Sequence, residues 1–279
     1  MKQEELKIIE KLTGITPSHI KLADDGFWSR GYVIDGGRIV FKFKKAPEVS
    51  YQTEIKMLEF VNSLDLGINT QKVGWISPDN SYLGIYGVIG QALNTVKSPD
   101  YASIARQFAN FLHQLHRAQP KNISEMTLEE EITAWQERYR KSHDELLKYF
   151  TESEIARLDE FILKTVPSKL RKLGENLVFS HGDLGDGNIF IDTAGKIGII
   201  DFSEMLYLDE AADFMDIESD ELRTQILDAY GANKILCEKV RLRVLVRPLF
   251  VFGDYARRGD TKYIIKLVDK IRELLLNIE

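Results

Sequence analysis

The spacing of apolar residues divides the 279-residue chain into a strand-rich first part and a helix-rich second part. In the first part, two runs rich in β-branched and aromatic residues flank Asp35-Gly36-Gly37, a pattern typical of a β-hairpin. Soon afterwards Ile55, Leu58 and Val61 recur at helical spacing. The predicted elements are helix 4–12, strands 32–34 and 39–43, helix 51–64, and strands 73–76, 82–86 and 88–89.

Beyond Ser98-Pro99 the pattern becomes mainly helical, and residues 102–117 form a strongly amphipathic segment. The predicted elements here are helices 102–117, 128–149 and 152–173, strands 177–179, 189–191 and 197–200, and helices from about 209 to the end. The change of composition near residues 88–91 indicates a domain boundary. We therefore expect an α+β fold with a strand-rich lobe over 1–87, a hinge over 88–91 and a helical lobe over 92–279.

Composition narrows the class of protein. A hydrophobic content of 44% supports a substantial core, and a net charge of −6 argues against a nucleic-acid binder. Cys237 is the only cysteine, which rules out an intramolecular disulfide, and we expect it to be buried in a helix. The sequence starts without the apolar core of a signal peptide and has no stretch as long as a membrane-spanning helix. We expect a cytoplasmic monomer with no membrane partner.

One segment carries most of the functional information. It reads His181-Gly182-Asp183-Leu184-Gly185-Asp186-Gly187-Asn188 and is followed, after a short strand-turn-strand, by Ile200-Asp201-Phe202. Kinase-type enzymes use an Asp, an Asn five positions on and a second Asp after a strand for phosphoryl transfer. Asp183 is thus the candidate base for an acceptor hydroxyl. Asn188 and Asp201 offer the oxygen ligands that Mg²⁺ prefers.

The alternative is a glycine-rich turn whose Asp and Asn side chains cap backbone groups. Two features favour the catalytic interpretation. Asp201 follows the apolar run 197–200, and a carboxylate at the end of a buried strand needs a compensating cation or donors. Gly182, Gly185 and Gly187 also allow a tight backbone path that would bring the Asp and Asn side chains together.

A lysine and a glutamate in the strand-rich part are candidates for orienting nucleotide phosphates. Lys42 lies on a predicted strand, and Glu54 on the following helix could pair with it. Lys44 is a competitor because alternation places it on the same strand face as Lys42. The alternative is that all three are ordinary exposed charges.

Two further segments are candidates for contacting the nucleotide. Residues 25–31 precede a strand where a kinase-type enzyme has its nucleotide-covering loop, but they lack the full G-x-G-x-x-G pattern. Backbone donors and Ser29 would therefore contact the phosphates, and a plain connecting turn is the alternative. In the expected hinge, backbone groups of Val88 and Gly90 would meet the nucleotide base.

Acidic residues gather just after the catalytic segment, with no Lys or Arg between Glu204 and Glu221. Such a surface would attract a cationic acceptor. The candidate acceptor-binding residues are Glu204, Asp209, Glu210 and Asp216. The alternative is a solvated helix face that pairs with later basic residues, namely Lys239, Arg241, Arg243 and Arg247.

Two pairs of residues have simpler interpretations. His113 and His116 are three residues apart, but no third metal ligand is evident, and a hydrogen-bonded core position is expected for His116. Trp28 and Trp75 are expected to pack against other side chains rather than to stack on a ligand.

Together these residues resemble the aminoglycoside phosphotransferases, antibiotic kinases with a two-lobed protein-kinase-like fold. The resemblance is sharpest over 177–216, weaker over 26–58, and closest to the kanamycin-type 3′ branch over 177–190. It implies a small antiparallel β-sheet lobe with one helix, which covers ATP or GTP. It also implies a larger, mainly helical lobe that binds the acceptor.

The resemblance also implies roles for single residues. Asp183 would be the catalytic base, Asn188 and Asp201 the magnesium ligands, Lys42 and Glu54 the phosphate-orienting pair, and Asp213 a brace of the catalytic loop. At Ser203 and Glu204 the sequence departs from the Gly-Arg often found there in the 3′ branch.

We therefore expect an aminoglycoside O-phosphotransferase that acts in antibiotic resistance. A second hypothesis keeps the chemistry and makes the acceptor a choline-like or sugar metabolite. A third is a catalytically silent nucleotide-binding or scaffold protein. Such proteins usually lack the base or a metal ligand, whereas Asp183, Asn188 and Asp201 are all present.

Overall fold

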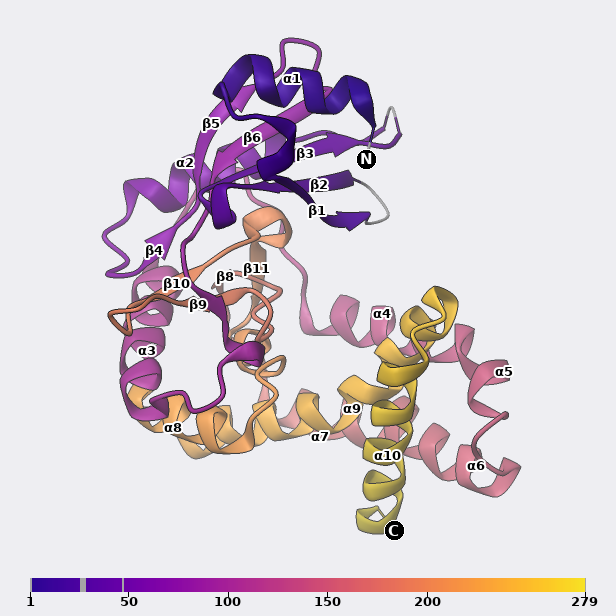
Figure 1. Ribbon diagram of the computed structural model, residues 1–279. Coiled ribbons are helices and arrows are strands. Elements are labelled where there is room, and N and C mark those ends of the chain that lie inside the picture. Colours follow the sequence, from indigo (N-terminus) through magenta and orange to yellow (C-terminus); the bar gives the residue numbers. More distant parts are fainter. Residues whose placement is uncertain (1, 26–28, 47, 279) are drawn as a thin grey trace. The chain divides into compact units, whose positions relative to one another are not determined.

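The computed structural model describes residues 2–25, 29–46 and 48–278 (Figure 1). The chain forms two compact units. The first holds the chain up to Pro120 together with Asp183–Met205 and Ile217–Tyr230. The second holds Lys121–Gly182, Leu206–Asp216 and the chain from Gly231 onward. The lobes expected at 1–87 and 92–279, with a hinge between them, stay a prediction.

A five-stranded sheet forms the strand-rich part of the first unit. Its order is β1-β2-β3-β6-β5, and neighbouring strands are antiparallel. The strands are β1 (Ile20–Asp25), β2 (Ser29–Ile34), β3 (Ile39–Lys44), β5 (Lys72–Ile76) and β6 (Tyr82–Tyr86). The predicted hairpin is confirmed, because the turn at Asp35–Gly37 places Ile34 opposite Ile39. Strand β1 was not predicted.

Two helices accompany this sheet, as the sequence predicted. Helix α1 (Gln3–Thr13) ends at Gly14, which has a φ of 71° that suits glycine. Its residue Ile9 is buried in a cluster with Tyr32 and Phe41 of the sheet. Helix α2 (Gln52–Ser63) lies between β3 and β5 in the chain and buries Glu54 in its first turn.

A second, four-stranded sheet lies in the first unit, and its strand β9 begins where the candidate catalytic segment ends. Its order is β4-β10-β9-β7, with β4 parallel to β10 and the other pairs antiparallel. The strands are β4 (Asn69–Thr70), β7 (Gln91–Ala92), β9 (Ile189–Ile191) and β10 (Ile197–Ile199). The strand predicted over 88–89 is wrong. Gly90 has a φ of 149° and turns the backbone, so that pairing begins only at Gln91.

Two packed helices complete the first unit. Helix α3 (Tyr101–Arg117) begins at Asp100, whose carboxylate caps it by accepting from Ser103 N, and it packs against α8 (Asp220–Tyr230). His116 Nδ1 lies 2.9 Å from the Tyr230 hydroxyl, and the rings of His113 and Tyr230 stack 4.3 Å apart. The hydrogen bond expected for His116 is thus confirmed, although this histidine is half-buried and not in the core.

The second unit is mainly helical. Strands β8 (Leu177–Ser180) and β11 (Leu206–Asp209) pair antiparallel, and the 3-10 helix η6 (Glu210–Phe214) follows. The helices are α4 (Leu128–Lys141), α5 (His143–Leu146), α6 (Glu152–Glu160), the π-helix η4 (Phe161–Thr165), α7 (Val166–Leu173), α9 (Lys234–Arg258) and α10 (Thr261–Asn277). The helix predicted over 128–149 is interrupted at Ser142, between α4 and α5.

Packing tests two expectations about single residues. Trp75 packs against Phe41 and Tyr86, with ring centroids 5.4 and 5.1 Å apart, as expected; Trp28 lies outside the described residues. Cys237 lies in α9 as expected but is exposed, so the expectation of burial was wrong. The buried face of this helix includes Leu236 and Val240, and Cys237 lies outside that face.

In the described part of the chain, no helix has the length and apolar character to cross a membrane.

Candidate active site

Lys42 connects two carboxylates in the first unit. Its Nζ lies 2.6 Å from Glu54 Oε1 and 3.4 Å from Asp201 Oδ1. Glu54 is only 5% exposed, so its carboxylate is held inside the protein by this ion pair. The structure therefore pairs Glu54 with Lys42 rather than with Lys44, which the sequence had left open as a competitor.

Burial and charge act in opposite directions on this pair. Burial by itself lowers the pKa of Lys42, but the charges of Glu54 and Asp201 outweigh it and raise the pKa above its usual value. For Glu54, burial is the larger effect and raises the pKa, although Lys42 acts to lower it. Lys42 is thus a fixed cation at neutral pH.

Asp201 lies two residues after the end of β10 and has an unusual backbone conformation. Its φ and ψ are 64° and 69°, in the left-handed region that non-glycine residues rarely adopt. Two contacts hold it there: Asp201 N donates to Gln71 Oε1 at 3.0 Å, and Ser203 Oγ donates to Asp201 Oδ1 at 2.9 Å. The side chain keeps 40% of its surface exposed, so a ligand can reach the carboxylate.

The catalytic segment brings Asp183 and Asn188 together. Asn188 Nδ2 donates to the main-chain oxygen and to Oδ2 of Asp183, each at 2.9 Å. Asp183 is exposed, as a base that meets an external hydroxyl must be. Of the three glycines expected to shape this loop, only Gly182 has a positive φ, 83°. The turn is closed instead by the bond from Asn188 N to the oxygen of Gly185 at 2.8 Å.

The second unit holds the backbone that directly precedes Asp183. Asp213, in η6, is 1% exposed and accepts hydrogen bonds from His181 N at 3.1 Å and Gly182 N at 3.0 Å. A carboxylate that accepts two backbone N–H groups is a strong anchor. The geometry is the brace that the resemblance implied for Asp213.

Glu204 is the acidic candidate whose charge interacts with Asp183 and Asp201. It is exposed, and desolvation together with the charges of Asp183 and Asp201 raises its pKa. Three carboxylates therefore act on one another in this part of the first unit. A cation placed among them would relieve that repulsion.

The other acidic candidates lie in the second unit and are largely engaged with basic residues. Asp209 is 1% exposed and contacts Lys239 Nζ at 2.7 Å and Arg243 Nη2 at 3.2 Å. Asp216 pairs with Arg247. The alternative interpretation of the acidic residues is that they pair with later basic residues, and these ion pairs agree with that alternative. Arg241 is an exception, because it pairs with Glu238 at 2.7 Å. The acidic residues thus do not form one exposed surface.

Glu210 is more exposed than Asp209 and Asp216, with 18% of its side chain exposed against 1% and 10%. It accepts a hydrogen bond from Asn176 Nδ2 at 3.0 Å, and Lys239 Nζ lies 4.0 Å away. Acceptor binding by any of the four acidic candidates stays a prediction.

The candidate nucleotide contacts are only partly described. Residues 26–28 of the expected covering loop lie outside the described residues, whereas Ser29 Oγ lies 2.9 Å from the hydroxyl of Tyr51. Burial raises the pKa of Tyr51 to about 12, so this hydroxyl stays protonated. Val88 is 7% exposed and Gly90 has a φ of 149°, and contact of either residue with a nucleotide base stays a prediction.

Sequence reasoning missed three supporting residues: Gln71, Tyr51 and Ser203. Gln71 contacts Asp201 from 130 positions away in the chain, so no local pattern could reveal it. Ser203 lies two positions from Asp201, and a hydroxyl so close to a buried strand end was a usable signal.

The donor set suits magnesium better than a metal that needs a full protein cage. Among the described residues, no group of three or more His, Cys, Asp or Glu side chains is arranged to hold a metal ion. Mg²⁺ is commonly bound by one or two protein oxygens together with substrate phosphates. Asp201 and the amide oxygen of Asn188 fit that smaller role.

Comparison with known proteins places this site in a family. Residues 19–241 match the family described as the phosphotransferase enzyme family, and the chain belongs to it. The fold is similar to that of the GDP and kanamycin complex of APH(2″)-IIIa, with a TM-score of 0.76, 20% identity and 99% of each chain covered. The predicted kinase-like α+β fold is confirmed.

Two other solved structures show the same fold. Macrolide 2′-phosphotransferase MphH from Brachybacterium faecium has a TM-score of 0.67 and 16% identity, over 97% of this chain and 98% of that one. Spectinomycin phosphotransferase APH(9)-Ia, in complex with ADP and spectinomycin, has a TM-score of 0.71 and 14% identity over 98% of each chain.

Proposed function

We propose that this protein transfers the γ-phosphate of ATP or GTP to a hydroxyl group of an aminoglycoside antibiotic, with Mg²⁺ as cofactor. The observation that carries the proposal is the pair of ion contacts from Lys42 to Glu54 and Asp201. A cation fixed beside a candidate metal ligand is what phosphoryl transfer requires, because positioning and charge neutralisation provide most of the catalysis.

Asp183 is proposed to accept the proton of the attacking hydroxyl. It is exposed, and the hydrogen bond from Asn188 Nδ2 orients its Oδ2. The anchoring of the preceding backbone by Asp213 limits the positions that the carboxylate can take. A positioned base contributes a factor of about 10²–10⁴ to the rate.

Asn188 and Asp201 are proposed to hold Mg²⁺, which when bound neutralises charge on the nucleotide phosphates. Lys42 adds a second positive charge at Asp201, and Glu54 fixes the direction of that lysine. Ser29 and backbone groups of the hinge, at Val88 and Gly90, are the proposed further contacts to the nucleotide.

The acceptor is proposed to be cationic because of Glu204. This exposed carboxylate makes the electrostatic potential more negative beside Asp183, where an acceptor hydroxyl must lie. Glu210 is a weaker candidate, and Asp209 and Asp216 would act mainly through their ion pairs with basic residues. The catalytic segment resembles the 3′ branch, so the 3′-hydroxyl of kanamycin is the first position to test.

A coupled assay of nucleoside diphosphate release tests this proposal. ATP and GTP are supplied in turn with kanamycin, gentamicin, spectinomycin, a macrolide and choline. Turnover is expected with an aminoglycoside, and removal of Mg²⁺ by EDTA should abolish it. NMR of the product identifies the phosphorylated hydroxyl. Turnover on choline alone, or nucleotide binding without transfer to any acceptor, would overturn the proposal.

Expression of the chain in an aminoglycoside-sensitive bacterium tests the proposed role in resistance. The minimal inhibitory concentration should rise for the antibiotics that are turned over in vitro, and an Asp183→Ala variant should give no protection. Size-exclusion chromatography with light scattering checks the proposed monomer, and cell fractionation checks the proposed cytoplasmic location.

A further inference from the structure

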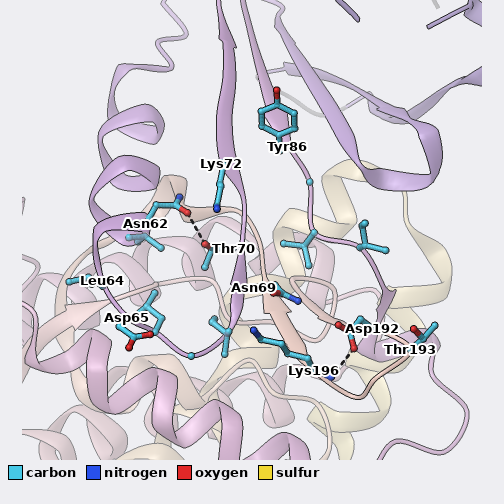
Figure 2. Close-up of a pocket in the computed structure, with 17 residues that line it drawn as sticks. Asn62, Leu64, Asp65, Asn69, Thr70, Lys72, Tyr86, Asp192, Thr193 and Lys196 are labelled. Atoms are coloured by element: carbon cyan, nitrogen blue, oxygen red, sulfur yellow. Dashed lines mark hydrogen bonds between the residues drawn. The ribbon is translucent and has the colours of Figure 1, made fainter.

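A cavity of about 650 Å³ lies in the first unit (Figure 2). Its wall is built by the end of α2 and the loop after it, by β4, β5 and β6, and by the turn between β9 and β10. Lys42, Glu54, Asp183, Asn188 and Asp201 are not among its lining residues, whereas Val88, a proposed hinge contact of the nucleotide, is one of them. Its size falls within the range of roughly 300–1,000 Å³ typical of small-molecule sites.

Two lysines from different elements line this cavity. Lys72 comes from β5 and Lys196 from the turn before β10; in Figure 2 Lys72 extends toward Thr70, and Lys196 lies beside Asn69. Two carboxylates also belong to the lining. Asp192 Oδ1 is used within its turn, where it accepts from the backbone N–H groups of Ala194 and Lys196 at 2.9 Å each. Asp65 lies toward the lower rim of the view in Figure 2.

An apolar wall faces the same space. Tyr86 is 49% exposed and Ile89 is 55% exposed, which is high for large apolar side chains. Tyr86 is the direct cross-strand partner of Lys72, so an apolar ring and an ammonium group are neighbours on the sheet. The ring of Tyr86 is held by Trp75, at a centroid distance of 5.1 Å.

The cavity is held in shape by hydrogen bonds. Asn62 Nδ2 donates to the oxygens of Leu58 and Gln71 at 2.7 Å each, and Thr70 Oγ1 donates to Asn62 Oδ1 at 3.1 Å. These bonds tie the end of α2 to β4 and to the residue that precedes β5.

Close packing holds the other side of the cavity. A Cβ at Gly198 would lie 2.3 Å from Val88 Cγ1, and one at Gly87 would lie 2.0 Å from the oxygen of Gly37. The segment that carries Ile89 is therefore packed tightly against its neighbours, and the cavity is preformed.

We propose that this cavity is a second binding site, for a small organic anion with an aromatic body. Its carboxylate or phosphate group lies between Lys72 and Lys196, and its ring contacts Tyr86 and Ile89. Charge-assisted hydrogen bonds to ammonium groups are about twice as strong as neutral ones, and the adjacent ring supplies apolar contact. The proposal does not depend on the acceptor or on phosphate transfer, because it is tested by binding.

Isothermal titration calorimetry with 2-naphthoate and 1-naphthyl phosphate tests the site. The titrations contain excess ADP and Mg²⁺, so that the proposed nucleotide site is already occupied. Both anions are expected to bind, and the neutral analogue 2-naphthalenemethanol should bind about tenfold more weakly. Lys72→Glu and Lys196→Glu should each weaken anion binding by about tenfold or more, since each places a negative charge beside the anion.

Lys7→Glu is the matched control, because it makes the same charge change at an exposed position of α1 and should bind as the unchanged protein does. Lys72→Met keeps most of the side chain and replaces the glutamate variant if that variant unfolds. A crystal structure with 2-naphthoate should show it against Tyr86. Equal binding of the neutral analogue, undiminished binding by both lysine variants, or no binding at all would overturn the proposal.

Discussion

Asn188 donates two hydrogen bonds from one nitrogen to Asp183, to its main-chain oxygen and to its Oδ2, each at 2.9 Å. One residue thereby fixes both the backbone and the carboxylate of the proposed base. Because its Nδ2 is used in this way, Oδ1 of the amide is the atom that would meet a cation. The same side chain can thus orient the base and hold the metal ion.

Asp183→Ala should lower kcat by about 10²–10⁴-fold, because the proposed proton acceptor is removed. Nucleotide binding should change little, since Lys42, Glu54 and Asp201 remain in contact. Steady-state kinetics and a nucleotide titration measure the two effects. Asp144→Ala is the control, at an exposed position of α5. Kanamycin phosphorylation at the unchanged rate by the Asp183 variant would show that the assignment of the base is wrong.

Lys42→Met should destabilise the protein by about 3 kcal/mol, because it leaves the carboxylate of Glu54 buried without its cation. The double variant Lys42→Met with Glu54→Leu should recover part of this loss. Urea unfolding of the two single variants and the double variant measures the coupling. Equal stability of Lys42→Met and the unchanged protein would mean that the ion pair contributes nothing.

The Lys42→Met variant should also gain pH dependence. Burial already raises the pKa of Glu54, and the variant removes the charge that opposes this rise. A raised carboxylate pKa in the folded state gives stability that is present below the usual value of 4.5 and is lost as the pH rises through the folded value. The variant should therefore lose more stability at pH 8 than at pH 5, relative to the unchanged protein.

Asp213→Ala should lower both stability and kcat. It removes the acceptor of two backbone N–H groups, those of His181 and Gly182. Each donor left without an acceptor should lower the free energy of unfolding by about 1–3 kcal/mol. Asp213→Asn should be milder because its amide oxygen can still accept one bond. Thermal unfolding and kinetics measure both effects, with Asp228→Ala in α8 as an exposed control. A fall in stability with no change in kcat would separate Asp213 from the positioning of Asp183.

Glu204→Gln should raise stability slightly at pH 8. Desolvation and the charges of Asp183 and Asp201 raise the pKa of Glu204 in the folded state, so its ionisation at neutral pH costs stability. The gain should be no more than about 1 kcal/mol, since exposed charges are screened. It should shrink toward pH 5, where less of the charge is present. Melting curves at the two pH values check the sign, and a variant less stable at pH 8 contradicts it.

The same variant tests the role of Glu204 in binding the acceptor. If its charge attracts a cationic substrate, Glu204→Gln should raise KM for the aminoglycoside and weaken the dependence of KM on salt. The KM for ATP or GTP should change less. An unchanged aminoglycoside KM would place the attraction elsewhere.

Local patterns were sufficient for most elements. The hairpin around 35–37 and helices α2 and α3 rest on residues close together in the chain, so alternation and helical spacing predict them. The short strand β4 and the start of pairing only at Gln91 depend on contacts with β10 and β9, which are about a hundred residues or more away in the chain. No short-range pattern carries that information.

Site residues divide in the same way. Asp183 and Asn188 are five residues apart, so their contact follows from the loop sequence itself. The choice of Lys42 over Lys44 as the partner of Glu54 needed the position of α2, because alternation treats both lysines alike.

The sequence by itself determined the reaction class, because the proposed base and the candidate metal ligands lie close together in the chain with characteristic spacing. Only the tertiary structure decided which charges face solvent. Asp209 and Glu204 belong to the same acidic stretch, yet one is buried with Lys239 and Arg243 and the other is exposed beside the catalytic carboxylates. The reason is physical: a charge is buried only where partners from distant segments meet it, and packing brings those partners together.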